Sequence, residues 1–318
     1  MQITFKNVGQ GDSIIIEWVR KGEPRLGIID CNLFQKANRV VQHLQKISCR
    51  KIDFIILSHP HYDHFSGMLE LLEFCGQQKI PIHTFVHSCA THPRYLNYAN
   101  TDSNKQDLLQ KIFQKAKALY ESKQIHFLGF IGQNTSITLN ENFILKTLSP
   151  SNSELEKFRQ DIDFYEKIDF SKCGKAANYL STVLKISNKK ESVVLTADAE
   201  KETFKRLEER HFDEFNDLLY LGQIPHHGSK ANHYPSFWSK IKRTSNCIAA
   251  VSTGGQYNHP HPEVIVDFAS WNCTIYSTNQ AQTLAKPIQM RTSTTLDMIS
   301  ELIEDVYENG DLTFNLNA

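Results

Sequence analysis

The chain contains 318 residues, of which 40% are hydrophobic and 22% are charged, and its 35 basic residues balance 35 acidic ones. This composition is typical of a globular protein and excludes a disordered or collagen-like chain. The formal net charge of zero excludes a global electrostatic surface for nucleic acid or anionic membranes. Recognition of a phosphate group therefore has to be local.

The sequence also indicates the cellular compartment in which the protein is expected. The longest apolar runs, such as Phe54 to Leu57, fall far short of the ~18 residues of a membrane span. The N-terminus shows neither the basic nor the apolar region of a signal peptide. The seven cysteines are scattered and form no Cys-x-x-Cys motif. We therefore expect a soluble cytoplasmic protein with reduced thiols and no contact with a membrane.

Short runs rich in Ile and Val alternate with polar stretches of helical periodicity, which predicts a mixed sheet covered by helices. We expect strands at Ile3–Val8, Ser13–Val19, Leu26–Asp30, Phe54–Ser58, Thr84–His87, Phe143–Leu148, Tyr179–Ile186, Ser192–Thr196, Leu218–Ile224, Cys247–Val251 and Thr274–Ser277. We expect helices at Gln35–Ile47, Gly67–Phe74, Lys105–Ser122, Ser153–Phe170, Lys201–Arg210 and Glu263–Ser270. The chain reads as two similar halves.

Two polar segments interrupt this pattern. Residues 97–123 and 151–175 look like insertions, and we expect amphipathic surface helices there, with a dedicated binding arm as the alternative. Residues 1–290 are expected to form one domain, and residues 291–318 a C-terminal extension that packs on it. The acidic pattern around Leu296–Tyr307 favours a docking helix, with a dimer or partner contact as the alternative.

Four metal-binding side chains follow the apolar strand that ends at Leu57, in the segment Ser58-His59-Pro60-His61-Tyr62-Asp63-His64. In extended backbone, alternate side chains point the same way. His59, His61 and Asp63 can thus converge on one point while His64 faces a neighbouring one. Imidazole nitrogens and carboxylate oxygens are zinc ligands in hydrolytic sites. The segment predicts a site for one or two divalent metal ions.

Three further predicted strands end in polar residues. Asp198 follows the first of them, His226-His227-Gly228-Ser229 follows the second, and Tyr257-Asn258-His259-Pro260-His261 comes soon after the third. Ligands collect beyond the carboxyl ends of strands in α/β sheets. Each signal alone is weak, but four coincident strand ends indicate one site.

Together these motifs resemble the metallo-β-lactamase-fold hydrolases. The opening segment Asn7-Val8-Gly9-Gln10-Gly11-Asp12-Ser13, Asp30 and the late Tyr257-Asn258-His259-Pro260 are similar to the C-terminal hydrolase domain of ComEC-type competence proteins and its free-standing relatives. The resemblance covers roughly residues 1–289. It implies an α/β fold, a four-layer αββα sandwich with a metal cluster at one edge of the two sheets, and hydrolysis of a phosphodiester. The competence proteins' membrane channel is absent, so DNA uptake does not transfer.

The resemblance also implies roles for individual residues. His59 and His61 would bind the first metal ion, Asp198 would bridge, and the second ion would take Asp63, His64 and His226. Asp63 would also orient the attacking water. Candidates for contacts to the scissile phosphate or for protonation of the leaving oxygen are His227, Ser229 and His259. The alternative for His227 is an orienting partner or another metal ligand.

One departure bears on the metal. Many members of the superfamily carry a histidine about twenty residues before the bridging aspartate, and here that position is Asn178. An amide oxygen is a harder and weaker ligand than imidazole. If Asn178 is a ligand, the site favours manganese over zinc; the alternative is a structural asparagine at the start of a strand.

Three functions fit the sequence. The first is a metal-dependent nuclease or phosphodiesterase that uses a metal-bridging water, and the second is a hydrolase of a small phosphoester or other ester. The third is an effector or scaffold subunit of a multi-protein bacterial defence assembly. A neutral chain is unusual for a non-specific DNA-binding protein, but a basic cluster of Lys230, Lys240, Lys242 and Arg243 is a candidate for local phosphate contacts.

Overall fold

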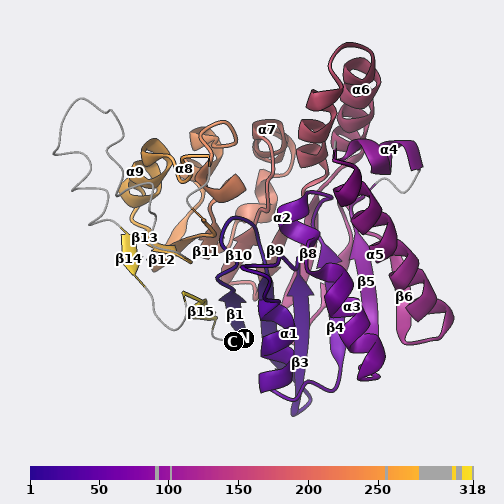
Figure 1. Cartoon of the computed structure of the whole chain (residues 1–318). Helices are drawn as coiled ribbons and strands as arrows, with labels where there is room; N and C mark the ends of the chain where they lie inside the picture. Colours follow the sequence, from indigo (N-terminus) through magenta and orange to yellow (C-terminus); the bar gives the residue numbers. More distant parts are fainter. Residues whose placement is uncertain (90–92, 101, 255–256, 279–302, 306–309, 317–318) are drawn as a thin grey trace.

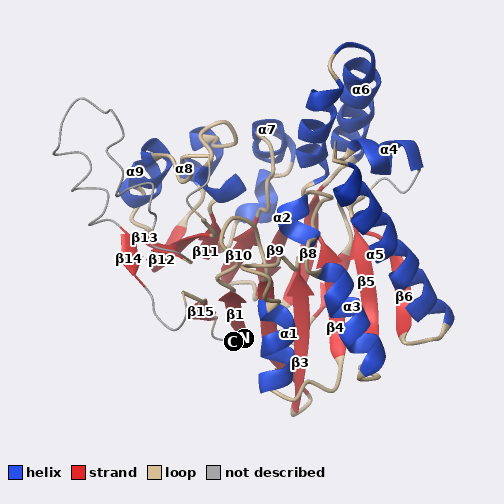
Figure 2. Ribbon diagram, viewed as in Figure 1, coloured by secondary structure: helices blue, strands red, loops and turns tan. Residues whose placement is uncertain are grey.

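The computed structural model describes residues 1–89, 93–100, 102–254, 257–278, 303–305 and 310–316. Within these residues, two sheets pack face to face and helices cover both outer faces (Figure 1, Figure 2). This arrangement confirms the four-layer αββα sandwich expected from the sequence. The two halves of the chain correspond closely to the two sheets.

The first sheet has seven strands in the order β15-β1-β2-β3-β4-β5-β6. Strands β15 to β3 pair antiparallel, and β3 to β6 pair parallel. The strands are β1 (Gln2–Phe5), β2 (Ile14–Arg20), β3 (Glu23–Ile29), β4 (Ile52–Leu57), β5 (Ile82–His87), β6 (Ile125–Phe130) and β15 (Leu312–Asn315). Because β3 and β4 are parallel, Asp30 and the histidine segment after Leu57 emerge at the same edge.

The second sheet has eight strands in the order β14-β13-β12-β11-β10-β9-β8-β7, parallel from β10 to β14. Its strands are β7 (Ser136–Thr138), β8 (Ile144–Ser149), β9 (Val183–Ser187), β10 (Glu191–Leu195), β11 (Leu218–Gln223), β12 (Arg243–Val251), β13 (Thr274–Ser277) and β14 (Ile303–Asp305). The carboxyl ends of β10 and β11 therefore present Asp198 and the His226–His227 pair together.

Helices cover both sheets. The first sheet packs against α1 (Arg39–Lys46), α3 (Met68–Gln77) and α5 (Ser103–Glu121). The second packs against α7 (Lys201–Arg210), α8 (Pro235–Lys240) and α9 (Pro262–Ser270). The remaining helical segments are α2 (Tyr62–Phe65), α4 (Pro93–Tyr98), α6 (Asn152–Ile168) and the 3₁₀ segments η1 (Phe170–Leu180), η2 (Phe212–Phe215) and η3 (Pro225–Gly228).

The core between the sheets is built from the inward faces of the strands of both halves. Phe54 of β4 is fully buried there, and its ring stacks on that of Trp18 with centroids 5.7 Å apart. Leu312 and Phe314 of β15 belong to the same core. The two halves of the chain therefore fold as one unit.

The expected insertions differ from one another in the structure. Helix α5, inside residues 97–123, buries Leu109, Ile112 and Ala116 in the core of the first sheet, so it is a crossover helix of the fold. Residues 151–175 lie in α6 and η1, which pack on each other and on α4 in a separate cluster at the top of Figure 1. This cluster covers the edge at which the strands end.

The C-terminal expectation is wrong in part. Residues 303–305 form strand β14 instead of a helix, and β15 pairs antiparallel with β1 as an edge strand of the first sheet. The backbone N-terminus of Met1 donates to the carbonyl of Leu316 at 2.9 Å. The rest of the predicted docking helix, residues 296–302 and 306–307, lies outside the described residues.

Two predicted boundaries also shift. Tyr179 and Leu180 belong to η1 and not to a strand, and helix α1 begins only at Arg39 because the Asn38 side chain caps it by accepting from the amide of Val41. No helix in the described ranges is long and apolar enough to cross a membrane.

We expect Phe54→Ala to lower the free energy of unfolding by about 3–5 kcal/mol, because it opens a cavity in the core between the sheets. The matched control is Phe164→Ala on α6, whose side chain is 57% exposed and whose loss should change stability by no more than about 0.5 kcal/mol. Equilibrium unfolding in urea measures both. Equal losses in the two variants would contradict the placement of Phe54.

Candidate metal centre

The residues predicted to bind metal meet where β4, β10 and β11 end. His59 to His64 follow β4, Asp198 follows β10, and His226 and His227 lie in η3 after β11. The turn before β2 packs against this edge, and a Cβ at Gly11 would lie 2.1 Å from the carbonyl oxygen of Asp63. Only glycine permits this close approach. We refer to His59, His61, Asp63, His64, Asp198, His226 and His227 as the histidine–aspartate cluster.

One part of the cluster surrounds Oδ1 of Asp198. Nε2 of His64 lies 3.4 Å from this oxygen, and Nε2 of His227 lies 3.5 Å from it. Nε2 of His227 is also 3.6 Å from Oδ2 of Asp63. These three residues and Asp198 thus face a common point.

The other part surrounds Oδ2 of Asp198. Nε2 of His59 lies 3.7 Å from it and Nε2 of His226 lies 3.4 Å from it. Nδ1 of His61 is 3.1 Å from Nε2 of His59. The geometry differs from the sequence-based grouping, because His227 and not His226 lies beside Asp63 and His64.

Hydrogen bonds on the outer side of the cluster fix four imidazole rings. Nδ1 of His59 contacts Oγ of Ser58 at 3.1 Å, and Nδ1 of His64 contacts Oδ2 of Asp30 at 2.7 Å. Two backbone carbonyls hold the others: Gly174 at 2.7 Å from Nε2 of His61, and Ser252 at 3.0 Å from Nδ1 of His227. Such outer partners orient imidazole ligands and set their tautomer. The rings of His59, His64 and His227 consequently turn Nε2 toward Asp198, and the ring of His61 turns Nδ1 toward His59.

These residues fit a divalent ion. Nε2 of His64, Nε2 of His227 and Oδ1 of Asp198 are buried and have no hydrogen-bond partner within the described part of the chain. Unpaired buried polar atoms are rare and costly in folded proteins. Neighbouring ligand atoms of a tetrahedral zinc site lie about 3.3 Å apart, close to the 3.4–3.6 Å spacings between these atoms.

The pKa shifts of the cluster residues also favour a bound cation. Burial raises the pKa of Asp198, but His226, His227 and His64 outweigh it and hold that pKa well below its usual value. Burial lowers the pKa of His227, but Asp198 and Asp63 raise it to about 9. Burial, with His64 and His61, lowers the pKa of His59. The carboxylates thus stay ionised in a buried pocket whose field favours cations.

Two groups that had no assigned role in the sequence lie behind the cluster. Asp12 accepts from the side-chain amide of Gln223 at 2.7 Å, and its backbone amide donates to the carbonyl of Asp63 at 3.2 Å. Asp30 accepts from both the amide and the hydroxyl of Ser58. Asp12 and Asp30 form a third potential ligand group with His64. In the sequence, both belong to the segments that carry the family resemblance, without an assigned role.

A family comparison agrees with this architecture. The family model described as Beta-lactamase superfamily domain matches residues 27–122, which include the His59–His64 segment. The chain has the metallo-β-lactamase fold. No curated protein gives a significant match.

Solved structures of this fold are similar to the chain at low sequence identity. The metallo-beta-lactamase fold protein YhfI from Bacillus subtilis shares 13% identity over 70% of each chain, with a TM-score of 0.36. A diphosphatase of the PhnP family shares 11% over 99% of this chain and 98% of its own, with a TM-score of 0.40. Zn²⁺-bound PqqB from Methylobacterium extorquens shares 10% over 99% and 100%, also with a TM-score of 0.40.

Of the two remaining predicted residues, His259 packs against the cluster and Asn178 contacts Glu200. Asn178 is buried in η1; its amide nitrogen donates to Glu200 at 2.9 Å, and its Oδ1 has no partner among the described residues. The ring of His259 packs against that of His226 at a centroid distance of 5.7 Å. Burial, followed by the charges of His226 and His227, lowers the pKa of His259 to about 4, so this imidazole is neutral at pH 7.

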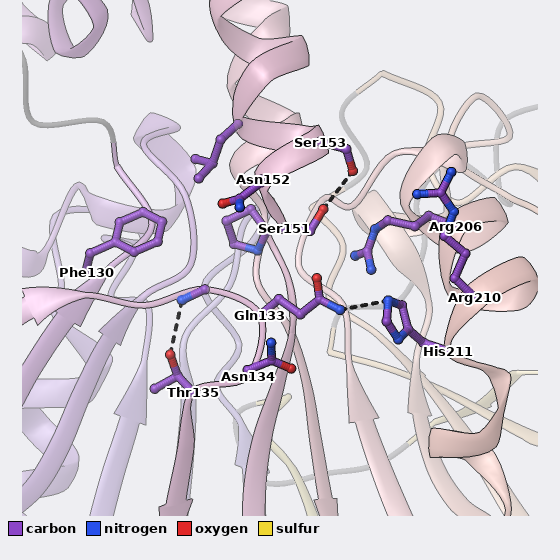
Figure 3. A pocket seen from close by; sticks show the side chains of 13 residues that line it. Phe130, Gln133, Asn134, Thr135, Ser151, Asn152, Ser153, Arg206, Arg210 and His211 are labelled. Carbon is purple, nitrogen blue, oxygen red and sulfur yellow. Dashed lines mark hydrogen bonds between the residues drawn. The ribbon is translucent and has the colours of Figure 1, made fainter.

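A polar cavity of about 370 Å³ opens elsewhere, between the β6–β7 loop, the start of α6 and the end of α7 (Figure 3). Arg206 and Arg210 extend from α7 on one side, and His211 contacts the side chain of Gln133 at 2.9 Å. Arg206 is engaged by Glu154. None of the cavity's lining residues belongs to the histidine–aspartate cluster, so it is separate from the metal centre.

We expect purified protein to carry about one to two transition-metal ions per chain, measured by elemental analysis. The double variant His59→Ala/His61→Ala and the single variant His227→Ala should each lose part of this metal, because they remove ligands from opposite sides of Asp198. The control is His83→Ala, which changes an exposed histidine of β5. Metal content equal to wild type in both ligand variants would refute the centre.

Proposed function

We propose that the protein is a metal-dependent hydrolase that cleaves phosphodiester bonds and acts as a nuclease. The observation that carries the proposal is the set of four oriented imidazoles. The inner nitrogens of His59, His64 and His227 face Asp198, and that of His61 faces His59. Zinc and manganese are the candidate ions.

The geometry supports one assignment of ligands. His59 through Nε2 and His61 through Nδ1 would hold the first ion, with Asp198 as the bridge. Asp63, His64 and His227 would hold the second. His226, which lies 3.4 Å from Oδ2 of Asp198, would complete the first site on its exposed side, near the position that Asn178 fills in place of a histidine.

Different residues of the centre would have different roles in hydrolysis. When bound, the ions would supply a water of lowered pKa and neutralise charge that develops on the phosphoryl oxygens. The carboxylate of Asp63 is 33% exposed, so it can accept a hydrogen bond from the attacking water and orient it. The neutral ring of His259, packed on His226, can donate a hydrogen bond to a phosphoryl oxygen from its N–H.

The segments that carry the resemblance to the competence proteins support a phosphodiester substrate, because they meet at the centre. The amide of Gly254 contacts Oε1 of Gln10 at 3.3 Å, and a Cβ at Gly254 would lie 2.2 Å from the amide nitrogen of Gln10. The amide of His261 donates to the carbonyl of Gly228 at 2.9 Å. The opening turn and the late His-Pro segment thus line the same site as the histidines.

Asp63→Ala should lower turnover of bis-p-nitrophenyl phosphate and of labelled DNA and RNA at least about 100-fold, because it removes a ligand and the group that orients the water. His259→Ala should lower kcat about 10- to 100-fold and leave metal content unchanged. Steady-state kinetics across Mn²⁺, Zn²⁺ and Mg²⁺, with elemental analysis of each variant, measures both.

Other substrates in the same assays test the competing functions. Cleavage of phosphomonoesters or carboxylic esters alone would replace the nuclease with a small-ester hydrolase. A wild-type protein that binds metal, cleaves no ester and co-purifies stoichiometrically with a protein partner would replace it with the scaffold subunit of a defence assembly.

The identity of the active metal depends on Asn178. Its Oδ1 is buried and available as a hard oxygen ligand, so we expect Mn²⁺ to support more activity than Zn²⁺ and excess zinc to inhibit. Asn178→His should bind zinc more tightly and lose part of the manganese preference. Zinc titration and the ratio of Mn²⁺ to Zn²⁺ activity measure this, and unchanged values would place Asn178 outside the ligand shell.

A further inference from the structure

We propose that Tyr257 is a stacking platform for a base of the nucleic-acid substrate, placed beside the metal centre. The inference rests on the proposed function and adds the substrate group that the protein recognises. Aromatic side chains stack on bases without regard to sequence, because every base has a π-face.

A continuous row of rings connects Tyr257 to the centre. Nε2 of His226 lies 3.4 Å from Oδ2 of Asp198. The ring of His226 packs on that of His259 with centroids 5.7 Å apart, and His259 packs on Tyr257 at 6.1 Å. These are normal separations for packed aromatic rings, so the tyrosine is two ring contacts away from a candidate ligand.

The row lies on the side from which substrate can reach the centre. The side chains of His59 and His64 are fully buried, whereas that of His226 is 26% exposed. Tyr257 is 76% exposed. A phosphate that approaches on the side of His226 therefore brings its neighbouring base toward the ring of Tyr257.

The backbone holds the ring in place. Tyr257 and Asn258 both have φ of +56°, a left-handed conformation that is unusual for a bulky residue. The flanking chain is anchored by the bond from Oγ1 of Thr253 to the carbonyl of His259 at 3.1 Å and by the amide of His261 on Gly228. An exposed aromatic ring presented by a strained, anchored segment is pre-organised for contact with a ligand.

A second exposed tyrosine, Tyr62, fits this role less well. It is 41% exposed, but Nζ of Lys105 lies 5.1 Å from its ring centroid and Phe65 packs edge-on at 5.8 Å. For Tyr257, His259 is the single ring neighbour within the described residues. Its face is thus the better surface for a base.

Three of the four residues in the basic cluster predicted from the sequence have partners in the structure. In the predicted basic cluster, Lys240 is paired with Glu208, Lys230 lies 3.9 Å from Glu263, and the guanidinium of Arg243 donates to the carbonyls of Trp238 and Ile241. With Lys230 and Lys240 beside carboxylates and a net charge of zero, stacking on Tyr257 would add a contact to nucleic acid that does not depend on charge.

The test compares a dinucleoside monophosphate with analogues in which one base or the other is replaced by hydrogen. Tyr257→Ala should raise KM for the complete compound about 5- to 100-fold, with kcat within about twofold. The effect should disappear for one of the base-free analogues, and Tyr257→Phe should restore the wild-type KM. The matched control is Tyr120→Ala, an exposed tyrosine of α5. A KM that is unchanged, or raised equally for the complete compound and both analogues, overturns the platform.

A binding measurement separates this inference from the proposed function. Saturation-transfer NMR with a mononucleotide requires no turnover, and the base protons should show contact in wild type and Tyr257→Phe but not in Tyr257→Ala. If wild type cleaves phosphodiesters while base contact is absent or equal in all variants, the platform fails and the function stands. If no phosphodiester is cleaved but base contact depends on Tyr257, the function fails and the platform stands.

Discussion

The buried imidazole of His64 and the carboxylates around it are the interaction on which the site depends. Nδ1 of His64 lies 2.7 Å from Asp30 and 4.0 Å from Asp12, and Nε2 lies 3.4 Å from Asp198. Burial lowers the pKa of His64, but Asp198 and Asp30 raise it well above its usual value. So many carboxylates at one buried point are costly unless cations balance them. Protonated histidine and divalent ions are the two cations that this geometry accepts.

This constraint also explains why the halves of the chain fold together. Asp12, Asp30 and His64 belong to the first sheet, whereas Asp198 and His227 follow strands of the second. The second half carries Asp198, His226 and His227, whereas the residues of His59–His64 come from the first half. The complete centre therefore forms only when the core between the sheets has packed. The distances between the ligand atoms therefore depend on how the core between the sheets packs.

Periodicity predicted a mixed sheet covered by helices, and the rule that ligands gather at carboxyl ends predicted the convergence of four strand ends. The four-layer sandwich came from the family resemblance. The sequence missed β6, β7, β14 and β15, which are the edge strands of the two sheets. β6 and β7 are partly exposed, and β15 pairs with β1 from the far end of the chain. The sequence could not decide which of His226 and His227 faces Asp63. Both residues have positive φ, so the alternation of side chains along a strand does not apply to them.

The same charges determine the order in which ligands reach the centre. A phosphodiester is an anion, and Asp63 is the more exposed of the two carboxylates in the cluster. Without bound cations this carboxylate and Asp198 would repel the phosphate, and the neutral surface of the chain offers no compensating attraction. We therefore expect the phosphate to bind after the ions. The rings of His259 and Tyr257 carry no negative charge and do not repel the phosphate. A base of the substrate can therefore stack on Tyr257 before the ions bind its phosphate.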